Sequence, residues 1–175
     1  MLAAIAILGV IAFFLFIYSG VYNVAATEPH IGFTYWVFNT TMKNSVQSRA
    51  DEIKVPPLLD PSLMKKGFMH YRETCVTCHG APGVKPFEIG KGLMPEPPDL
   101  AKSAEKWTPA ELYWIIKHGI KMTGMPAWGS GHKEEELWAL AAFVKRLPEL
   151  SPEQYQTMEQ EAGDKGQSPR AGQNH

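Results

Sequence analysis

The sequence has no excess of positive charge, little cysteine, and no charge at all near its start. It has 175 residues and a formal net charge of -1. Proteins that bind nucleic acid carry a basic excess, so we expect no nucleic-acid partner. Only two cysteines are present, Cys75 and Cys78, three positions apart. Any chemistry that needs both thiols is therefore confined to one short segment.

No charged side chain occurs between Leu2 and Ala26. About 20 apolar helical residues are needed to cross the hydrocarbon core of a bilayer. A cleaved signal peptide is the alternative, but the basic region that normally begins one is missing. We therefore predict that residues 1–26 are a single transmembrane anchor in the lipid bilayer. Lys43 is the first Lys or Arg in the chain, so the positive-inside rule gives no orientation.

Aromatic and then proline-rich sequence follows the anchor. Residues 31–38 hold four aromatic side chains, and an apolar stripe at helical spacing continues toward Ile53. Because Tyr and Trp favour the membrane–water boundary, we expect a helix lying on the membrane or on a partner subunit. A helix packed on its own domain is the alternative. The prolines near position 57 then indicate a stiff linker, so residues 27–61 form an interfacial helix and a Pro-rich linker.

The remainder of the chain contains three helical patterns separated by loops. The first runs from Ser62 to the cysteines, the second covers residues 107–119, and the third covers residues 133–147. Thr108 and Glu111 form a capping-box pattern at the start of the second. These patterns predict an all-α domain over residues 62–150. Residues 151–175 are polar, and we predict a disordered tail there.

The segment Cys75-Val-Thr-Cys78-His79 admits four interpretations. A disulfide across so short a loop would stabilise little. A thioredoxin-like pair requires a strand before it, whereas a helix is expected here. A zinc site would need a fourth ligand, recruited from His70 or His118. The fourth interpretation is c-type haem attachment, in which each thiol forms a thioether with the haem and His79 binds the iron.

A second iron ligand would strengthen the haem interpretation, and Met125 is the candidate. Gly124 before it permits unusual backbone angles, and Pro126 after it disfavours the helical region. Met125 is therefore expected in an extended loop from which its thioether can face iron. Weaker alternatives also occur in the sequence: Met94, Met122 and His118.

Residues 62–150 resemble the class I cytochromes c, small electron carriers with one haem and His/Met ligation. The matching features are KGFMHYRETCVTCHG, PPDL ending at Leu100, TGMPAW, and the last helix with Leu137-Trp138-Ala139. The resemblance implies the cytochrome c fold around one haem c, attached through Cys75 and Cys78. It also implies His79 and Met125 as the iron ligands.

The resemblance carries further expectations for packing around the haem. A glycine and an aromatic residue of the first helix, here Gly67 and Tyr71, should cross the last helix closely at Trp138, Ala141 or Ala142. The carbonyl of Pro97 or Pro98 should orient His79. Trp128 should border a haem propionate, with core packing as the alternative. The lysines that could surround the haem edge for docking are Lys85, Lys91, Lys117 and Lys121.

The expected function follows from the two expected iron ligands, His79 and Met125. Haem iron with both axial positions filled does not readily bind a substrate, so one-electron transfer is expected instead. We expect an electron carrier and not an enzyme, anchored in the bacterial inner membrane by a single pass, with its haem domain in the periplasm. Its partners would be respiratory proteins such as a quinol-oxidising complex, a dehydrogenase or a terminal oxidase. A fixed haem c subunit of a larger membrane oxidoreductase is the alternative, and a haem sensor or peroxidase is a third.

Overall fold

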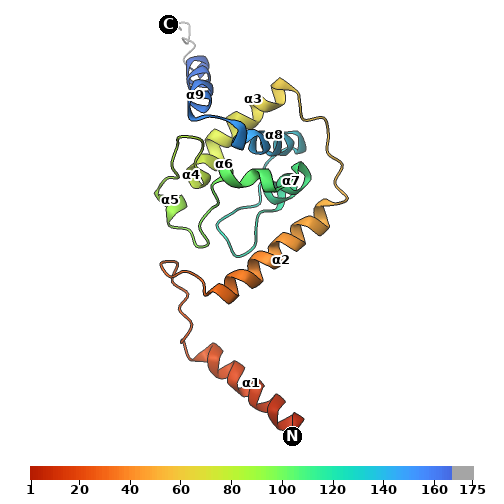
Figure 1. The fold of residues 1–175 in the computed structure, drawn as a ribbon, viewed down its shortest axis with the longest axis vertical. Coiled ribbons are helices and arrows are strands. Elements are labelled where there is room, and N and C mark those ends of the chain that lie inside the picture. The colour runs from red at the N-terminus through yellow and green to blue at the C-terminus, as the bar shows by residue number, and fades with distance from the viewer. Residues whose placement is uncertain (167–175) are drawn as a thin grey trace, which may run out of the picture.

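Capping residues determine where the main helices begin in the computed structural model, which describes residues 1–166 (Figure 1). The Asp60 side chain accepts a hydrogen bond from the Ser62 amide at 2.8 Å, and Pro61 occupies the first helical position. Thr108 and Glu111 form the predicted capping box, in which each side chain accepts a hydrogen bond from the other residue's amide. The helix predicted there is therefore confirmed.

Helices account for all the regular structure of residues 1–166 apart from one isolated bridge between Ala81 and Val84. The long helices are α1 (Leu2–Tyr18), α2 (Gly32–Ala50), α3 (Pro61–His70), α7 (Pro109–His118), α8 (Glu134–Arg146) and α9 (Pro152–Gly166). The short elements are a π-helical turn (Tyr71–Cys75), α4 (Val76–His79), α5 (Glu88–Lys91), α6 (Leu100–Ser103), and 3₁₀ turns at Ala104–Lys106 and Leu147–Glu149. The predicted all-α class is confirmed.

The core is organised around the crossing of α3 and α8. Gly67 of α3 lies so close to α8 that an added Cβ would overlap the Ala139 carbonyl oxygen and lie 2.7 Å from Cβ of Phe143. The Tyr71 ring packs on the Phe143 ring with centroids 5.3 Å apart, and both side chains are fully buried. The expected crossing is therefore present, but its partners are Ala139 and Phe143 instead of Trp138, Ala141 or Ala142.

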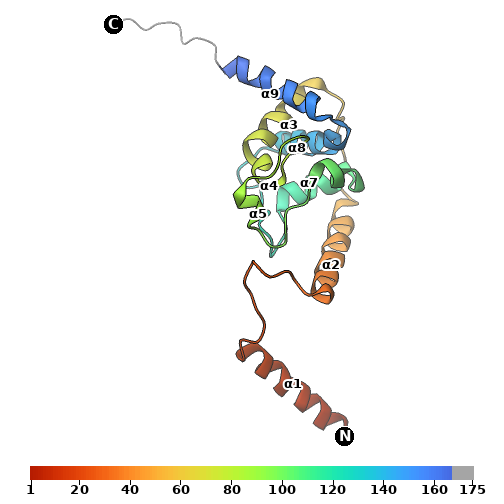
Figure 2. The same cartoon turned by 60° about the vertical axis from the view of Figure 1, so that its left-hand side comes forward.

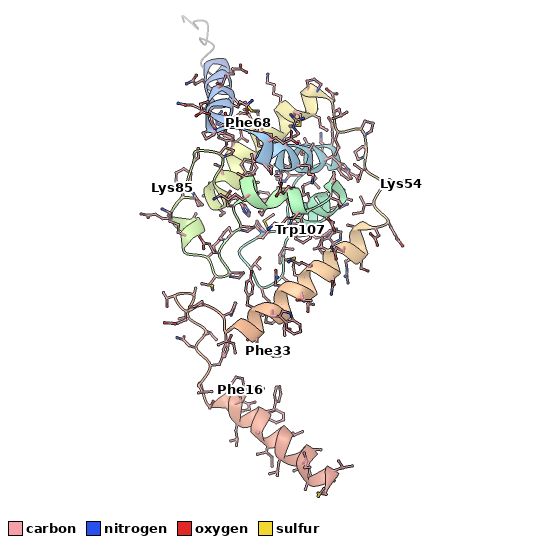
Figure 3. All side chains as sticks on the ribbon, viewed as in Figure 1. Phe16, Phe33, Lys54, Phe68, Lys85 and Trp107 are labelled. Atoms are coloured by element: carbon pink, nitrogen blue, oxygen red, sulfur yellow. The ribbon has the colours of Figure 1, made fainter. Side chains whose placement is uncertain are left out.

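Helix α2 packs on the domain formed by the later helices through its carboxyl-terminal half. Val46 and Ala50 are buried, and α2 lies against α7 in both views (Figure 2). The amino-terminal half leaves Phe33 exposed (Figure 3). Trp36 is exposed as well, with its ring centroid 6.1 Å from that of Phe33. Packing on its own domain is therefore confirmed for the carboxyl-terminal half, and contact of the exposed half with a membrane or a partner subunit stays a prediction.

The single transmembrane helix predicted over residues 1–26 is not found. Helix α1 has 17 residues and ends at Tyr18, where the Ser19 hydroxyl donates to the Phe16 carbonyl and Gly20 takes a φ of 67°. At 1.5 Å per residue such a helix is about 26 Å long. Within residues 1–166, no helix combines the length and the apolar character that crossing a membrane requires.

The predicted disordered tail is wrong for residues 152–166, which form α9. Ser151 and Gln154 make a second capping box: the Gln154 amide donates to Ser151 Oγ at 3.2 Å, and the Ser151 amide donates to Gln154 Oε1 at 2.8 Å. Tyr155 is buried, with its ring centroid 5.6 Å from that of Phe68. The rest of the predicted tail, residues 167–175, lies outside the described residues.

Replacing Gly67 by alanine tests the close crossing. We expect Gly67→Ala to lower the free energy of unfolding by about 1–3 kcal/mol, because the new methyl group must displace the backbone of α8. The measurement is guanidinium unfolding of the full chain. Gly163→Ala in α9 is the control, since nothing lies within 4 Å of an added Cβ there. A loss equal to that of the control would contradict the described crossing.

Candidate functional site

The Cys-Val-Thr-Cys-His segment begins at the end of the π-helical turn and ends with α4. Cys75 is buried, Cys78 is half-buried, and neither forms a disulfide. Burial raises the pKa of the Cys75 thiol to about 11. Both thiols are therefore free, and that of Cys75 is protonated at neutral pH. The disulfide interpretation of this pair is not realised.

Three contacts hold this segment in place. The Tyr71 hydroxyl donates a buried hydrogen bond to the Gly80 carbonyl at 2.6 Å, which closes the chain around the segment. The Phe87 amide donates to the Thr77 carbonyl at 3.0 Å. Gly90 lies against the Cys78 backbone, where an added Cβ would come within 2.8 Å of the Cys78 Cα. The proline-rich loop after His79 therefore packs back on the cysteines instead of extending into solvent.

His79 is oriented by a backbone carbonyl. Its Nδ1 lies 2.9 Å from the Pro98 carbonyl oxygen, a bond in which Nδ1–H is the donor. Burial lowers the pKa of His79, which favours the neutral ring. The proton on Nδ1 leaves the Nε2 lone pair available to a metal ion. The structure thus confirms the expectation of a proline carbonyl beside His79 and assigns it to Pro98.

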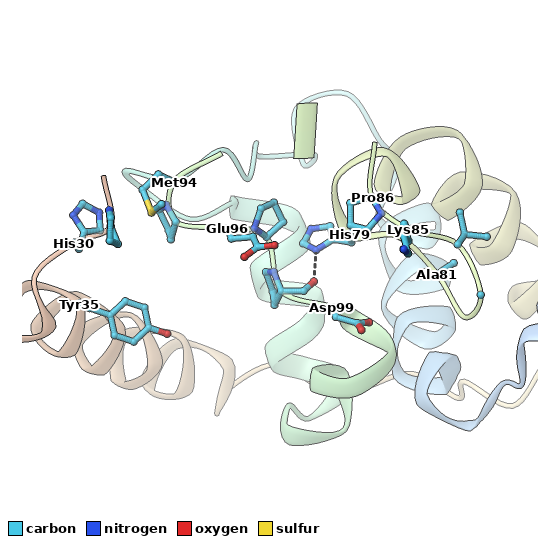
Figure 4. Close-up of a pocket in the computed structure, with 15 residues that line it drawn as sticks. His30, Tyr35, His79, Ala81, Lys85, Pro86, Met94, Glu96 and Asp99 are labelled. Carbon is cyan, nitrogen blue, oxygen red and sulfur yellow. Dashed lines mark hydrogen bonds between the residues drawn. The ribbon is translucent and has the colours of Figure 1, made fainter. Parts of the chain in front are cut away.

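His79 lines a half-open cavity of about 940 Å³ (Figure 4). Its walls come from three segments: the loop of residues 81–86, the loop of residues 94–99, and residues 29–35 near the start of α2. This volume lies at the upper end of the roughly 300–1,000 Å³ typical of cofactor pockets. The cavity is therefore large enough for a large planar cofactor.

Met125 does not line this cavity. The Met125 carbonyl accepts a hydrogen bond from the Ile120 amide at 3.2 Å, and its amide donates to Thr123 Oγ1 at 3.1 Å. The adjacent Gly124 lies under the Leu93 side chain, so the loop of Met125 packs on the loop that carries Met94. Met94, a weaker alternative, does line the cavity. Met125 is outside helices, as predicted, and its role as an iron ligand stays a prediction.

The other candidate ligands lie elsewhere. The His118 ring packs on Trp114 with centroids 4.9 Å apart, and the His70 ring packs on His132 with centroids 5.6 Å apart. Among the described residues, no three His, Cys, Asp or Glu side chains gather as a metal site. The donor set of the zinc interpretation is therefore not assembled. Trp128 is half-buried against the hydrophobic core.

Comparison with known families gives a match over the helical domain. Residues 62–144, slightly less than half of the chain, match the family described as "Cytochrome C oxidase, cbb3-type, subunit III". The match supports a c-type cytochrome. No curated protein and no solved structure matches the chain.

A cytochrome domain of this family implies covalently bound haem c, and the residues present fit that group. The cysteines are free, burial favours the neutral His79 ring, and Pro98 holds that ring. Of these residues only His79 and Pro98 line the cavity. No local pattern predicts the hydrogen bond from Tyr71 to the Gly80 carbonyl, because this contact depends on the path of the loop. The sequence likewise does not predict that Tyr35 lines the cavity, because this residue lies far from the Cys-Val-Thr-Cys-His segment.

Removing the Tyr71 hydroxyl tests the contact that closes the segment. We expect Tyr71→Phe to lower the free energy of unfolding by about 1–3 kcal/mol, because the buried Gly80 carbonyl loses its hydrogen-bond donor. Denaturant titration of the haem-containing protein is the measurement. Tyr18→Phe, in the exposed α1, is the matched control and should change nothing. Unchanged stability in Tyr71→Phe would show that the bond contributes nothing.

Proposed function

We propose that this cytochrome carries one haem c, attached through thioethers to Cys75 and Cys78, with His79 and Met125 as iron ligands. The observation that carries the proposal is the bond from His79 Nδ1 to the Pro98 carbonyl. It leaves the Nε2 lone pair available to iron, in the residue that directly follows two free thiols, and this supports covalent haem attachment here. Met125 is supported by its loop position between Gly124 and Pro126.

Its role under this proposal is one-electron transfer. An imidazole and a thioether fill both axial positions, and the thioether raises the reduction potential. With no open position for a substrate, the protein acts as a carrier and not as an enzyme. Residues 71–99 then serve to hold His79 and keep the cofactor in place, since they supply its orienting carbonyl and much of the cavity wall.

We further propose that α1 holds the cytochrome at the bacterial cytoplasmic membrane, with the haem domain on the periplasmic side. None of the α1 residues is buried and none is charged, so the helix exposes a continuous apolar surface (Figure 3). Exposed apolar surface of this extent marks a contact with lipid or with another protein. The proposal concerns attachment through α1 and the exposed aromatic pair Phe33 and Trp36 of α2.

The redox partners under this proposal are respiratory-chain proteins, with the cytochrome acting as a carrier between them. A second candidate is a fixed haem subunit of a membrane oxidoreductase, favoured by the family description of an oxidase subunit. The subunits that co-purify in mild detergent distinguish the two, because a carrier is recovered alone.

Substituting the sulfur ligand tests the haem site. We expect Met125→Ala to remove the weak red-edge absorption band of iron–thioether bonding, to open the iron to carbon monoxide, and to lower the reduction potential. Spectra of the oxidised and reduced proteins are the measurement. Met122→Ala is the matched control, since this exposed methionine belongs to the same loop.

A different ligand would give a different pattern. If Met94→Ala removes the band and Met125→Ala does not, Met94 of the cavity wall is the ligand and the assignment of Met125 fails. Covalent attachment is checked on the same samples, because denatured protein should keep its haem unless Cys75 and Cys78 are both replaced by alanine.

Deleting residues 1–26 tests attachment to the membrane. We expect the truncated protein, exported with a cleavable leader, to leave the membrane fraction and retain its haem, because α1 contributes no residue to the core. The full chain should be released by detergent but not by high salt. A truncated protein that still sediments with membranes would exclude α1 as the attachment.

A further inference from the structure

The loop that carries Met125 is attached to the end of α7 by backbone hydrogen bonds. The Ile120 amide donates to the Met125 carbonyl at 3.2 Å, and the Trp128 amide donates to the Ile116 carbonyl at 3.1 Å. Gly119 lies so near the returning chain that an added Cβ would come within 2.7 Å of the Met125 carbonyl oxygen. The base of this loop is therefore fixed against α7.

Residues 121–124 form the tip of the loop, and the Thr123 hydroxyl bonds to the backbone at both ends of it. Thr123 Oγ1 donates to the Ile120 carbonyl at 2.7 Å and accepts from the Met125 amide at 3.1 Å. Ile120 and Met125 are thus joined twice, once directly through their backbone and once through this hydroxyl. A single side chain therefore fixes both ends of the tip.

The backbone at Met122 shows that the tip is constrained. Met122 has a φ of 61°, in the left-handed region that few residues other than glycine adopt. Its side chain is 76% exposed, so burial of this side chain does not hold the backbone there. Such a conformation persists only where the surrounding contacts fix it. Thr123 supplies two of these contacts, because its hydroxyl bonds to residues on either side of Met122.

Contacts with the core do not place the Met125 side chain. Met125 is half-buried, and within residues 1–166 it is not one of the half-buried apolar residues that pack on the hydrophobic core. Methionine has three rotatable bonds, so its thioether is flexible unless its backbone is held. A ligand that is already ordered before binding loses less conformational freedom and binds more tightly. The conformation of the loop therefore bears directly on how well this thioether can bind.

We propose that Thr123 is a positioning residue, whose hydroxyl holds the loop in the conformation from which the Met125 thioether binds the iron. The inference rests on the proposed haem site and adds to it a residue that need not touch the iron. Without the hydroxyl, the tip of the loop would adopt several conformations. A competing ligand would then displace the thioether more easily.

Competition by imidazole tests this inference on the full, haem-loaded chain in its ferric state. Thr123→Val removes the hydroxyl and keeps the shape of the side chain. We expect it to bind imidazole about threefold to tenfold more tightly, as the loss of a hydrogen bond that holds the competing thioether predicts. Thr123→Ser keeps a hydroxyl and should bind imidazole as the unsubstituted protein does. Loss of the weak red-edge absorption band during the titration is the measurement.

Thr108→Val is the matched control. The Thr108 hydroxyl accepts a hydrogen bond from the Glu111 amide at the start of α7, so this change also removes a hydroxyl that bonds to the backbone. It should lower the free energy of unfolding. It should leave the affinity for imidazole unchanged, since Thr108 lies at the opposite end of α7 from the Met125 loop.

Hydrogen exchange of the unsubstituted protein provides a second, independent measurement. The Met125 amide should exchange more slowly than an exposed amide, because it donates to Thr123 Oγ1. The inference is overturned if this amide is unprotected, or if Thr123→Val binds imidazole no more tightly than Thr108→Val or Thr123→Ser. Failure of the proposed function gives a different result, because Met125→Ala would then bind imidazole no more tightly than the unsubstituted protein.

Discussion

The close approach of α3 and α8 at Gly67 is the constraint on which the rest of the domain depends. Only a hydrogen at this position lets the Ala139 backbone come so near. Once the helices cross there, Phe143 of α8 packs on Tyr71, and the Tyr71 hydroxyl reaches the Gly80 carbonyl. The crossing therefore determines where both ends of the Cys-Val-Thr-Cys-His segment lie, although it contributes no atom to the cavity.

Loops, rather than helices, complete the candidate site. The segment after His79 returns to the cysteines through Phe87 and Gly90, and then supplies the Pro98 carbonyl that orients the imidazole. Such a loop would ordinarily leave many backbone groups without partners. Here its amides and carbonyls bond to the helix end that it surrounds. The loop that follows His79 therefore holds its ring in one orientation.

Local signals in the sequence predicted much of this structure, and tertiary contacts account for what they missed. The capping box at Thr108 acts over a few residues, so it could be recognised directly. The Cys-Val-Thr-Cys-His segment is equally local, and its interpretation as a haem attachment site stays a prediction. The capping box at Ser151 was an equally local signal, hidden by the polar composition of the residues around it. In contrast, burial of Tyr155 against Phe68 and the approach of Tyr35 to the cavity depend on how distant segments pack.

The π-helical turn at Tyr71–Cys75 affects which side of the helix its side chains face. Gly67, Tyr71 and Cys75 follow one another at steps of four, and in a regular α-helix each step would rotate the side chain by about 40°. The wider turn absorbs part of this rotation, so that all three residues remain on the buried face. The segment therefore has one wider turn between two α-helical turns. In a regular α-helix Cys75 would be rotated by about 80° from Gly67, so the irregular turn contributes to the burial of Cys75.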